Sequence, residues 1–554
     1  MSLTKSTKQS NGFTIIELVV VMAIIGILAS ISIVGYGSWR QSITTTQLKS
    51  DLHGVAAAME NARTFGDEYP ASIPATFTPS LGVSLSGGSY DGNSYCIEAV
   101  STEDASVKYH VSDGSSTTQS GGCPFTSFVV RWGGTGNDLG NATIKTSDGG
   151  FAITGNTYSF GGGGSDMFLA KYNSDGTLSW DKTWGGSRDD VGRSLVETKD
   201  GGILVTGNTS SYGTAVATMY YADIFLAKYN SDGDLLWSNT WGGPNIDDST
   251  SIAQSNDGSI LIVGRTASYG AGANDILIAK FSAGGNFMWG KTWGGPSQDY
   301  GNAIAQASDG GVVVTGYTQS YGAGTHDMII AKFSYSDGTL LWNNVWGGAS
   351  TDIGNSIVKT NDGGMVVTGR TDSFAPGSGD MFIAKYSTDG TLIWDKTWGG
   401  TGQDYGNSIV QTANGDLSIT GYTYSYGAGG SDMFLAKYSS DGNLLWNRTW
   451  GGLSSGDTGK SIIQTSSDGG FAVTGVSYSY SAGLADMFLA KYSTDGIITN
   501  CSSPMCQDPT ATVADPIAAF SSPTAAVSNQ TGSVTNPTPA DVSPDAILEV
   551  IVAP

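Results

Sequence analysis

One stretch decides the fold of most of this chain: residues 346–397 read WGGASTDIGNSIVKTNDGGMVVTGRTDSFAPGSGDMFIAKYSTDGTLIWDKT. It holds four short apolar runs, beginning near positions 355, 365, 380 and 392, which are separated by Asp-Gly pairs and by a glycine-containing loop. Short apolar runs with turn residues between them predict β-strands joined by tight connections. The stretch therefore predicts one antiparallel sheet of four strands.

The same pattern recurs through the central part of the chain. The tryptophan of each Trp-Gly-Gly falls at positions 132, 184, 241, 293, 346, 398 and 450, so successive units lie 52 to 57 residues apart. Seven units of four strands, at a period near 50 residues, are typical of a β-propeller. We expect an all-β seven-bladed propeller over residues 125–500.

The two ends of the repeat array predict how the ring closes. Before Trp132 lies only a run of the fourth type, TSFVVRW, and the last unit stops after Asp495-Gly496 without its own tryptophan run. The first strand of the array is therefore expected to complete the last blade, pairing residues near 128 with residues near 490. This closure leaves no free sheet edge at the junction.

Composition excludes several classes of function. Of 554 residues, 80 are glycine, 39% are hydrophobic and only 14% are charged, which fits strands and turns better than helical bundles or a disordered chain. The net charge of -23 repels phosphate backbones, so no nucleic-acid partner is expected. With three histidines and four cysteines, a metal or nucleophile site has little material, and we expect no cofactor, no metal and no catalytic residue.

A single long apolar stretch lies near the N-terminus. Residues 13–34, FTIIELVVVMAIIGILASISIV, are apolar except for small polar residues and Glu17, and as a helix they span about 33 Å, enough for a bilayer core. Lys5 and Lys8 precede the stretch, so the positive-inside rule leaves the leader in the cytoplasm. The sequence predicts a single pass through the cytoplasmic membrane with the C-terminus outside.

The ordered run GFTIIELVVVMAIIGILASI, residues 12–31, resembles the N-terminus of type IV pilins and of the pseudopilins of type II secretion. The resemblance implies that prepilin peptidase cuts after Gly12, that Phe13 becomes the methylated N-terminal residue, and that Glu17 pairs with the terminal amine of a neighbouring pilin subunit. A carboxylate within a membrane costs about 2.5–3.5 kcal/mol on insertion scales, which favours such a partner. Many members have a proline where this chain has Val34, so their helix kink is not implied here. An ordinary membrane anchor is the alternative.

The segment after the membrane stretch predicts a helix and a small head. Apolar residues at positions 48, 52, 55, 59 and 62 lie on one helical face, and we expect the helix to run to about Phe65. Residues 66–124 are rich in turns and contain strand-like runs such as SYCIEAV and VKYHV. This part is similar to a small α+β pilin head, closed by a disulfide between Cys96 and Cys123.

The remaining cysteines leave the pairing open. Four cysteines allow three pairings, and we favour Cys96–Cys123 together with a local Cys501–Cys506 clasp. The rival is Cys123–Cys501, because both residues flank the ring closure. After Cys501 the composition shifts to Pro, Thr, Ser and Ala with little periodicity, which predicts a flexible or extended tail over residues 501–554 that ends in the apolar piece AILEVIVA.

These inferences divide the chain into five parts. They are a prepilin leader (1–12), a transmembrane pilin helix (13–65), a small pilin-like head (66–124), the propeller (125–500) and the tail (501–554).

Residues that recur in every unit are expected to serve folding, because every blade needs them. The fourth run carries a tryptophan that we expect to pack blade against blade, at positions 180, 237, 289, 342, 394 and 446. An aspartate before the third run is expected to bond its loop, and a lysine five residues later to link blades, as in Asp166 and Lys171. Glycines of the Asp-Gly pairs supply the positive φ of hairpin turns.

A further aspartate enters each first strand, nearest the ring axis. These residues are Asp138, Asp190, Asp248, Asp299, Asp352, Asp404 and Asp457. Each is expected to cap its own loop, and the alternative is a ring of carboxylates that attracts a cation.

The loops that follow the second run point to a binding role. The chain enters and leaves the propeller on the face that carries the Asp-Gly turns. These loops lie on the opposite face, and they combine tyrosine with glycine. We expect the ligand-binding residues to be Tyr212, Tyr220, Tyr221, Tyr269, Tyr321 and Tyr426, and the ligand to be carbohydrate or a host-surface polymer. The alternative is that these aromatics only cover the blade tops.

The repeats also resemble SBBP-type secreted bacterial propellers, for which no single activity follows, and the fourth run is similar to the tryptophan motif of quinone-dependent dehydrogenases in its packing residues only. The sequence as a whole predicts a minor or tip pilin-like subunit that displays a propeller for adhesion outside the cell. The alternatives are a membrane-anchored propeller enzyme and a scaffold within a type II secretion-like machine.

Overall fold

The computed structural model describes residues 44–63, 69–70, 73–74, 76–89, 95–102, 107–112, 117–120, 127–213, 222–375, 378–427, 429–452, 456–465, 469–481, 484–498, 519–521, 526–528, 533–535 and 540–542. The chain divides into two compact units, Met1–Pro124 and Phe125–Pro554. The predictions for Gly12, Phe13 and Glu17 fall outside the described residues, as does the apolar stretch 13–34. In the part of the chain that is described, no helix is long and apolar enough to cross a membrane.

The first unit packs one helix on one antiparallel sheet. Residues 44–61 are helical, and the strands are β1 (Val83–Ser89), β2 (Tyr95–Ser101), β3 (Lys108–Ser112) and β4 (Gln119–Ser120), paired in that order. The predicted apolar helix face at 48, 52, 55 and 59 is fully buried and shares one core with Tyr95, Ile97 and Ala99 of β2. The helix ends four residues before the expected Phe65.

Cys96 lies in β2 with 6% of its surface exposed, and it is disulfide-bonded. Cys123, Cys501 and Cys506 lie outside the described residues, so the Cys96–Cys123 pairing and the Cys501–Cys506 clasp stay predictions.

The second unit is built from seven antiparallel sheets, numbered here in chain order. Sheet 1 consists of β6 (Asp138–Lys145), β7 (Phe151–Thr157), β8 (Asp166–Tyr172) and β9 (Leu178–Trp184). Sheet 2 consists of β10 (Asp190–Glu197), β11 (Ile203–Thr209), β12 (Asp223–Tyr229) and β13 (Leu235–Gly242). Sheet 3 consists of β14 (Asp247–Gln254), β15 (Ile260–Thr266), β16 (Asp275–Phe281) and β17 (Phe287–Gly294). Sheet 4 consists of β18 (Asp299–Gln306), β19 (Val312–Thr318), β20 (Asp327–Phe333) and β21 (Leu340–Gly347).

The last three sheets repeat the same order. Sheet 5 consists of β22 (Asp352–Lys359), β23 (Met365–Thr371), β24 (Asp380–Tyr386) and β25 (Leu392–Gly399). Sheet 6 consists of β26 (Asp404–Gln411), β27 (Leu417–Thr423), β28 (Asp432–Tyr438) and β29 (Leu444–Trp450). Sheet 7 consists of β30 (Asp457–Gln464), β31 (Phe471–Ser477), β32 (Asp486–Tyr492) and β5 (Phe128–Trp132).

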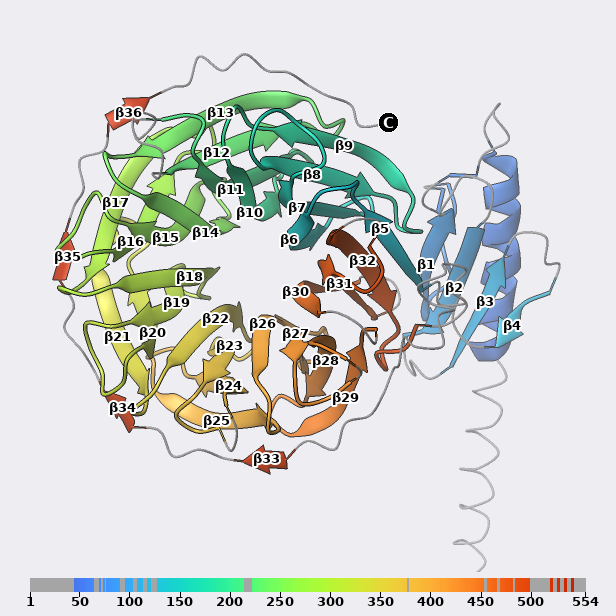
Figure 1. Cartoon of the computed structure of the whole chain (residues 1–554). Coiled ribbons are helices and arrows are strands. Elements are labelled where there is room, and N and C mark those ends of the chain that lie inside the picture. The colour runs from blue at the N-terminus through green and yellow to red at the C-terminus, as the bar shows by residue number, and fades with distance from the viewer. Residues whose placement is uncertain are drawn as a thin grey trace, which may run out of the picture. The chain divides into compact units, whose positions relative to one another are not determined.

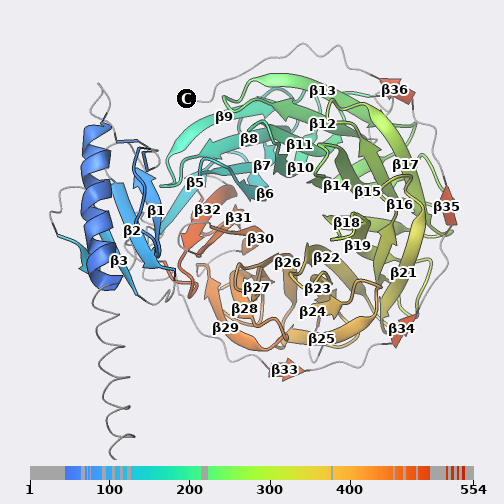
Figure 2. The same ribbon diagram turned by 180° about the vertical axis from the view of Figure 1, so that it is seen from behind.

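The sheets stand side by side in a propeller-like ring, with the first strand of each sheet nearest the centre in both opposite views (Figure 1 and Figure 2). The predicted closure is confirmed: β5 pairs antiparallel with β32, with Trp132 opposite Met487 and Phe128 opposite Lys491. Glycines of the Asp-Gly turns have the expected positive φ, for example 87° at Gly149 and 91° at Gly176.

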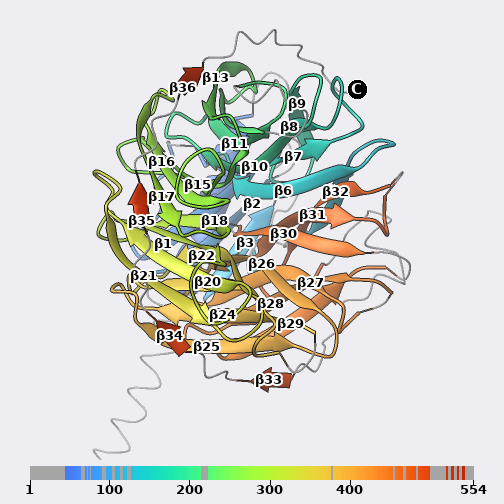
Figure 3. The same ribbon diagram turned by 60° about the vertical axis from the view of Figure 1, so that its left-hand side comes forward.

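Four short strands of the tail add a fifth strand to four sheets. They are β33 (Ala519–Ser521) on β25, β34 (Ala526–Ser528) on β21, β35 (Ser533–Thr535) on β17 and β36 (Ala540–Val542) on β13, along the outer rim (Figure 3). Each pairs antiparallel with the end of an outer strand, as Ala519 does with Gly399. The strands begin every seven residues, so the expectation of a tail with little periodicity is wrong.

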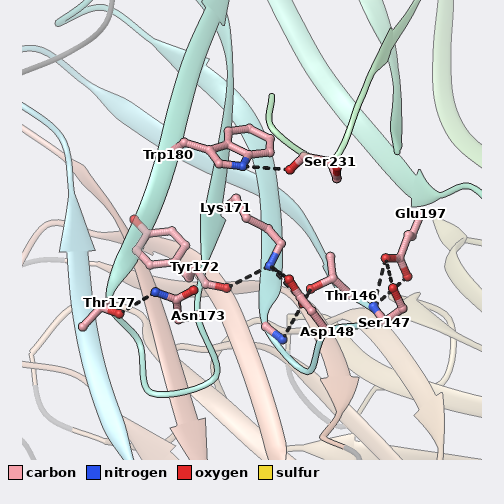
Figure 4. Close-up of polar contacts among 11 residues, drawn as sticks. Thr146, Ser147, Asp148, Lys171, Tyr172, Asn173, Thr177, Trp180, Glu197 and Ser231 are labelled. Carbon is pink, nitrogen blue, oxygen red and sulfur yellow. Dashed lines mark hydrogen bonds and ion pairs between the residues drawn. The ribbon is translucent and has the colours of Figure 1, made fainter. Parts of the chain in front are cut away.

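The expected packing role of the tryptophans is confirmed. Trp180 of sheet 1 lies against sheet 2, where its indole N–H donates to the Ser231 carbonyl at 3.1 Å (Figure 4). Trp184, from the Trp-Gly-Gly motif, stacks on Phe225 of sheet 2 with ring centroids 4.5 Å apart. Because a fully buried indole removes about 150–250 Å² from water, Trp184 contributes about 4–6 kcal/mol of hydrophobic free energy to the contact between sheets, and the half-buried Trp180 contributes less.

The recurring lysines differ from their expected role. Lys171 donates from Nζ to Asp148 at 2.7 Å, in the turn between the first two strands of its own sheet (Figure 4). The same pairing within a sheet joins Lys228 to Asp200, Lys332 to Asp309, Lys385 to Asp362 and Lys437 to Asp416. These five lysines therefore fix turns rather than link blades, because the side chain reaches the nearest turn carboxylate. Lys280 does cross to the next sheet, 3.4 Å from the ring centroid of Tyr335.

Candidate binding surface on the loop face

Two sets of loops meet on one face of the ring, called the loop face here. One set joins the fourth strand of a sheet to the first strand of the next, and the other joins second to third strands. Backbone hydrogen bonds connect them: Asp190 N–H donates to Ser165 O at 2.6 Å, and Tyr158 N–H donates to Asn137 O at 2.9 Å. The expectation that both loop sets share a face is confirmed.

The first-strand aspartates cap these loops. Asp138 is fully buried, and its Oδ2 accepts hydrogen bonds from the Gly134 N–H at 2.8 Å and the Ser159 hydroxyl at 2.6 Å, while Thr157 donates to Oδ1. The alternative of a cation-attracting ring is wrong, since these carboxylates are buried and bonded within their loops. Within the described residues, no group of three or more His, Cys, Asp or Glu side chains is placed to hold a metal ion.

Asp248 does not belong to this set. In sheet 3 the capping carboxylate is Asp247, which accepts from Gly243 N–H at 2.7 Å and from the Ser268 hydroxyl at 2.7 Å. Asp248 instead pairs with Arg265, whose Nη2 lies 2.5 Å from Oδ2. Asp247 follows Trp241 by six residues, the same spacing as from Trp132 to Asp138, so the sequence prediction had chosen the wrong one of two adjacent aspartates.

Each capping aspartate has a second carboxylate beside it, from the third strand of the preceding sheet. A Cβ placed on Gly185 would lie 1.9 Å from Asp166 Oδ1 and 2.7 Å from Asp190 Oδ2, so only glycine fits between them. Burial, followed by repulsion from Asp190, raises the pKa of Asp166 to about 7. Burial and Asp404 likewise raise the pKa of Asp380 to about 7. Asp166 and Asp380 therefore hold protons on the loop face at mildly acidic pH.

Four of the tyrosines expected to bind ligand are described, and all four are half-buried. The Tyr212 hydroxyl donates to the Gly185 carbonyl at 2.7 Å, and its ring centroid lies 5.2 Å from that of Trp184. Tyr269, Tyr321 and Tyr426 donate to the equivalent carbonyls at 3.2, 3.1 and 2.8 Å. These rings cover the contact between sheets. Tyr220 and Tyr221 lie outside the described residues.

A second set of tyrosines on the same loops is exposed. Tyr158, Tyr424 and Tyr478 expose 54%, 56% and 49% of their surface and occupy one register position, directly after the second strand, in sheets 1, 6 and 7. Hydrogen bonds from Thr143 N–H to Ser461 Oγ and from Ile462 N–H to Ser408 Oγ join the three sheets side by side. Sequence reasoning missed this set. The sequence signal that could have identified it is that the residue at this position differs between sheets: sheets 2 to 5 have Ser210, Ala267, Gln319 and Asp372 there.

Two stacks of arginine on tyrosine lie at the loop-face ends of the strands, and the second contacts an exposed tyrosine. In the first, the Arg265 guanidinium lies 4.7 Å from the Tyr300 ring centroid, and Tyr300 stacks on Tyr317 at 4.7 Å. The Tyr317 ring meets the His326 ring edge-on at 4.9 Å. Burial, then Arg370, lowers the pKa of His326.

The second stack repeats this arrangement two sheets further on. Arg370 lies 4.6 Å from the Tyr405 centroid, Tyr405 stacks on Tyr422 at 4.6 Å, and Tyr422 meets the exposed Tyr424 at 5.9 Å. Both nitrogens of the Arg370 fork bind Asp372, at 2.6 and 2.7 Å. The loop face thus offers flat rings together with paired donors and acceptors, which are the groups that contact sugar rings and their hydroxyls.

Comparisons with known proteins match the N-terminal segment and the first propeller repeat. A model of the prokaryotic N-terminal methylation motif matches residues 7–33, and a model described as a domain of unknown function, DUF5122 beta-propeller, matches residues 146–178. A fimbrial protein of Pseudomonas aeruginosa is 40% identical over 65 residues, which cover 12% of this chain and 42% of that protein. Regulatory protein FlaEY of Caulobacter vibrioides is 28% identical over 147 residues, covering 22% of this chain and 15% of that protein. The matches span less than half of either relative.

Among solved structures, a fungal alcohol oxidase in complex with copper is similar at 12% identity and a TM-score of 0.39, covering 67% of this chain and 77% of that one. The NanB sialidase of Streptococcus pneumoniae is similar at 10% identity and a TM-score of 0.34, covering 73% and 84%. These values carry no argument about activity. The sequence matches show which parts the chain contains: a pilin-type N-terminus with a methylation motif is joined to β-propeller repeats.

Proposed function

We propose that this type IV pilus-related protein is a minor or tip subunit of a pilus or pseudopilus, and that a seven-bladed propeller in it binds a ligand outside the cell. The observation that carries the proposal is the methylation motif at residues 7–33 on the same chain as the aromatic loop face. Prepilin peptidase would process the chain at Gly12, and Glu17 would serve assembly with other pilin subunits, from the cytoplasmic membrane into the filament.

The direction of the chain supports display of the loop face. The propeller-like unit begins at Phe128, which pairs with Lys491 close to the turn at Asp495. This end of the sheet lies opposite the loop face, so the chain enters the propeller-like unit at the end of β5 that is away from the exposed tyrosines.

The chemistry of the loop face supports a neutral carbohydrate, or another hydroxyl-rich host-surface polymer, as the ligand. The net charge of -23 disfavours polyanions. Arg265 and Arg370 are already paired with Asp248 and Asp372, so their net charge is neutralised while further donors and acceptors remain at each pair. Tyr158, Tyr424 and Tyr478 offer exposed rings at one-sheet intervals.

The test is glycan-array binding by the full chain in detergent. The variant Tyr158→Ala/Tyr424→Ala/Tyr478→Ala should bind at least about tenfold more weakly, because each lost aromatic contact is worth about 0.5–1.5 kcal/mol. The matched control is Leu178→Ala/Leu445→Ala, which removes two exposed apolar side chains from the fourth strands of sheets 1 and 6. Full binding by a folded triple variant would refute the assignment of the surface.

A further inference from the structure

Each innermost strand carries one β-bulge at the same position. The register shifts between Gly140 and Ala142 in β6, and the equivalent shift recurs in the first strand of every sheet. A bulge leaves one residue unpaired and redirects its side chain. Around the ring, the bulged residues are Asn141, Arg193, Thr250, Asn302, Asn355, Asn407 and Lys460.

At five of the seven bulges the side chain links neighbouring sheets. Asn141 Nδ2 donates to the carbonyl of Gly192 in β10 at 2.9 Å, and the acceptor lies one residue before the next bulge. Thr250, Asn302, Asn355 and Asn407 make the equivalent bond to the following sheet at 2.7 to 2.9 Å. The bulged residues therefore form a polar belt around the inner rim.

Arg193 and Lys460 interrupt this belt with positive charge. Both residues reach solvent, although protein atoms surround their charged groups closely enough to desolvate them, and their strands, β10 and β30, flank β6 on either side. Among the described residues Lys460 has no hydrogen-bond or ion-pair partner, and Arg193 donates from Nε to Asn208 Oδ1 at 3.2 Å. The two cations are electrostatically coupled, because burial and then Arg193 lower the pKa of the Lys460 ammonium.

The surrounding charges do not neutralise this pair. Asp248, the carboxylate that acts on Arg193, is held by Arg265 at 2.5 Å, and Arg265 itself repels Arg193. Two mutually repelling cations thus stand at positions where four other sheets have asparagine. In a chain of net charge -23, such a pair is a local positive site that would attract an anion.

We propose that Arg193 and Lys460 bind a small multivalent oxyanion of the phosphate or sulfate class at the inner rim of the ring. A guanidinium presents a fork of N–H donors, an ammonium adds a point charge, and Asn141 between them has a second amide N–H. The site is separate from the exposed tyrosines and does not depend on the proposed carbohydrate binding.

The direct test is calorimetric titration of the full chain in detergent with inorganic phosphate, and then with sulfate, in an anion-poor buffer. The variants are Arg193→Asn and Lys460→Asn, since asparagine already occupies this bulge in other sheets. Each should weaken binding at least about tenfold, and the double variant should abolish it. The matched control, Lys182→Asn on β9, makes the same change of charge away from the inner rim and should bind as the wild type does. Equal affinity in all variants, or no binding by the wild type at millimolar phosphate, would overturn the proposal.

Thermal unfolding gives a second, independent readout. Without anion the double variant should melt at a higher temperature than the wild type, because the repulsion is gone and the asparagines can complete the belt. Phosphate should raise the melting temperature of the wild type and leave that of the double variant unchanged. A wild-type melting temperature that does not change when phosphate is added would contradict the proposed anion site. The Tyr158→Ala/Tyr424→Ala/Tyr478→Ala variant should retain the phosphate response, which separates this test from that of the carbohydrate surface.

Discussion

The buried aspartates of the loop face predict that this protein loses stability as the pH rises from 5 to 8. Burial raises the pKa of Asp166 and Asp380 from 3.8 to about 7, and that of Asp327 to about 6. A carboxyl group that holds its proton more tightly when folded stabilises the folded state fully below its unfolded pKa. That contribution disappears as the pH rises through the folded pKa.

The magnitude follows from these shifts. Between pH 5 and pH 8, a group whose pKa moves from 3.8 to 7 loses about 2.6 kcal/mol of stabilisation, and a group whose pKa moves to 6 loses about 1.4 kcal/mol. The three residues together contribute about 6–7 kcal/mol. The turn carboxylates that pair with lysine affect stability in a different pH range. The pKa of Asp362 is lowered to about 2, mainly by Lys385, so its stabilisation is lost only in stronger acid. His326, whose pKa is lowered, opposes the trend.

The assay is thermal unfolding of the full chain, followed by circular dichroism at pH 5, 6, 7 and 8. The melting temperature should fall by about 6–14 °C over this range, given about 1–2 °C per kcal/mol for a unit of this size. The variant Asp166→Asn/Asp380→Asn should show a much smaller slope, since asparagine does not ionise. Asp175→Asn, in the turn between β8 and β9, is the matched control and should keep the wild-type slope. A wild-type melting temperature that is constant or rises from pH 5 to pH 8 would refute the reasoning.

Three further outcomes are expected. Replacing Gly12 by leucine should leave the leader attached, and mass spectrometry that finds a mature N-terminal Phe13 in this variant would contradict the processing site. Tyr212→Phe should cost about 1 kcal/mol of unfolding free energy, because one hydrogen bond to a carbonyl is lost, and should leave glycan binding unchanged; a loss of glycan binding by this folded variant would restore Tyr212 as a ligand contact. Removing residues 507–554 should expose the outer strands that pair with β33–β36 and increase self-association in light scattering, whereas a monodisperse product would show that these edges need no cover.

The repeat unit was readable from sequence because its signals are local and occur many times. Trp-Gly-Gly, the Asp-Gly turns and the apolar runs fix strand number and order, and the incomplete first and last units fix the closure between β5 and β32. Packing of Trp180 on the next sheet followed from its recurrence in the outer strand. These features depend on residues that are close together in the sequence, and they recur in every unit of about 50 residues, so they can be recognised.

The proposed functional surface was harder to predict because residues that recur in every unit serve packing, whereas the exposed tyrosines occur in only some units. Tyr212 and its equivalents recur because every contact between sheets needs a ring and a hydroxyl there, while Tyr158, Tyr424 and Tyr478 vary between units. The Arg–Tyr stacks join residues more than 30 positions apart, as in Arg265 and Tyr300, so no local pattern marks them. The tail did carry a signal that was overlooked, with prolines at 516, 523, 537 and 544 following its seven-residue period.

The central claim is that a pilin-type N-terminus carries the propeller-like unit into a filament. Immunogold electron microscopy with antibody against residues 125–500, on filaments sheared from cells that express the full chain, tests it most directly. We predict gold at filament tips or at sparse positions along filaments, and its loss when Glu17→Ala blocks assembly. Label confined to the cell envelope, with filaments bare in the wild type, would contradict the account.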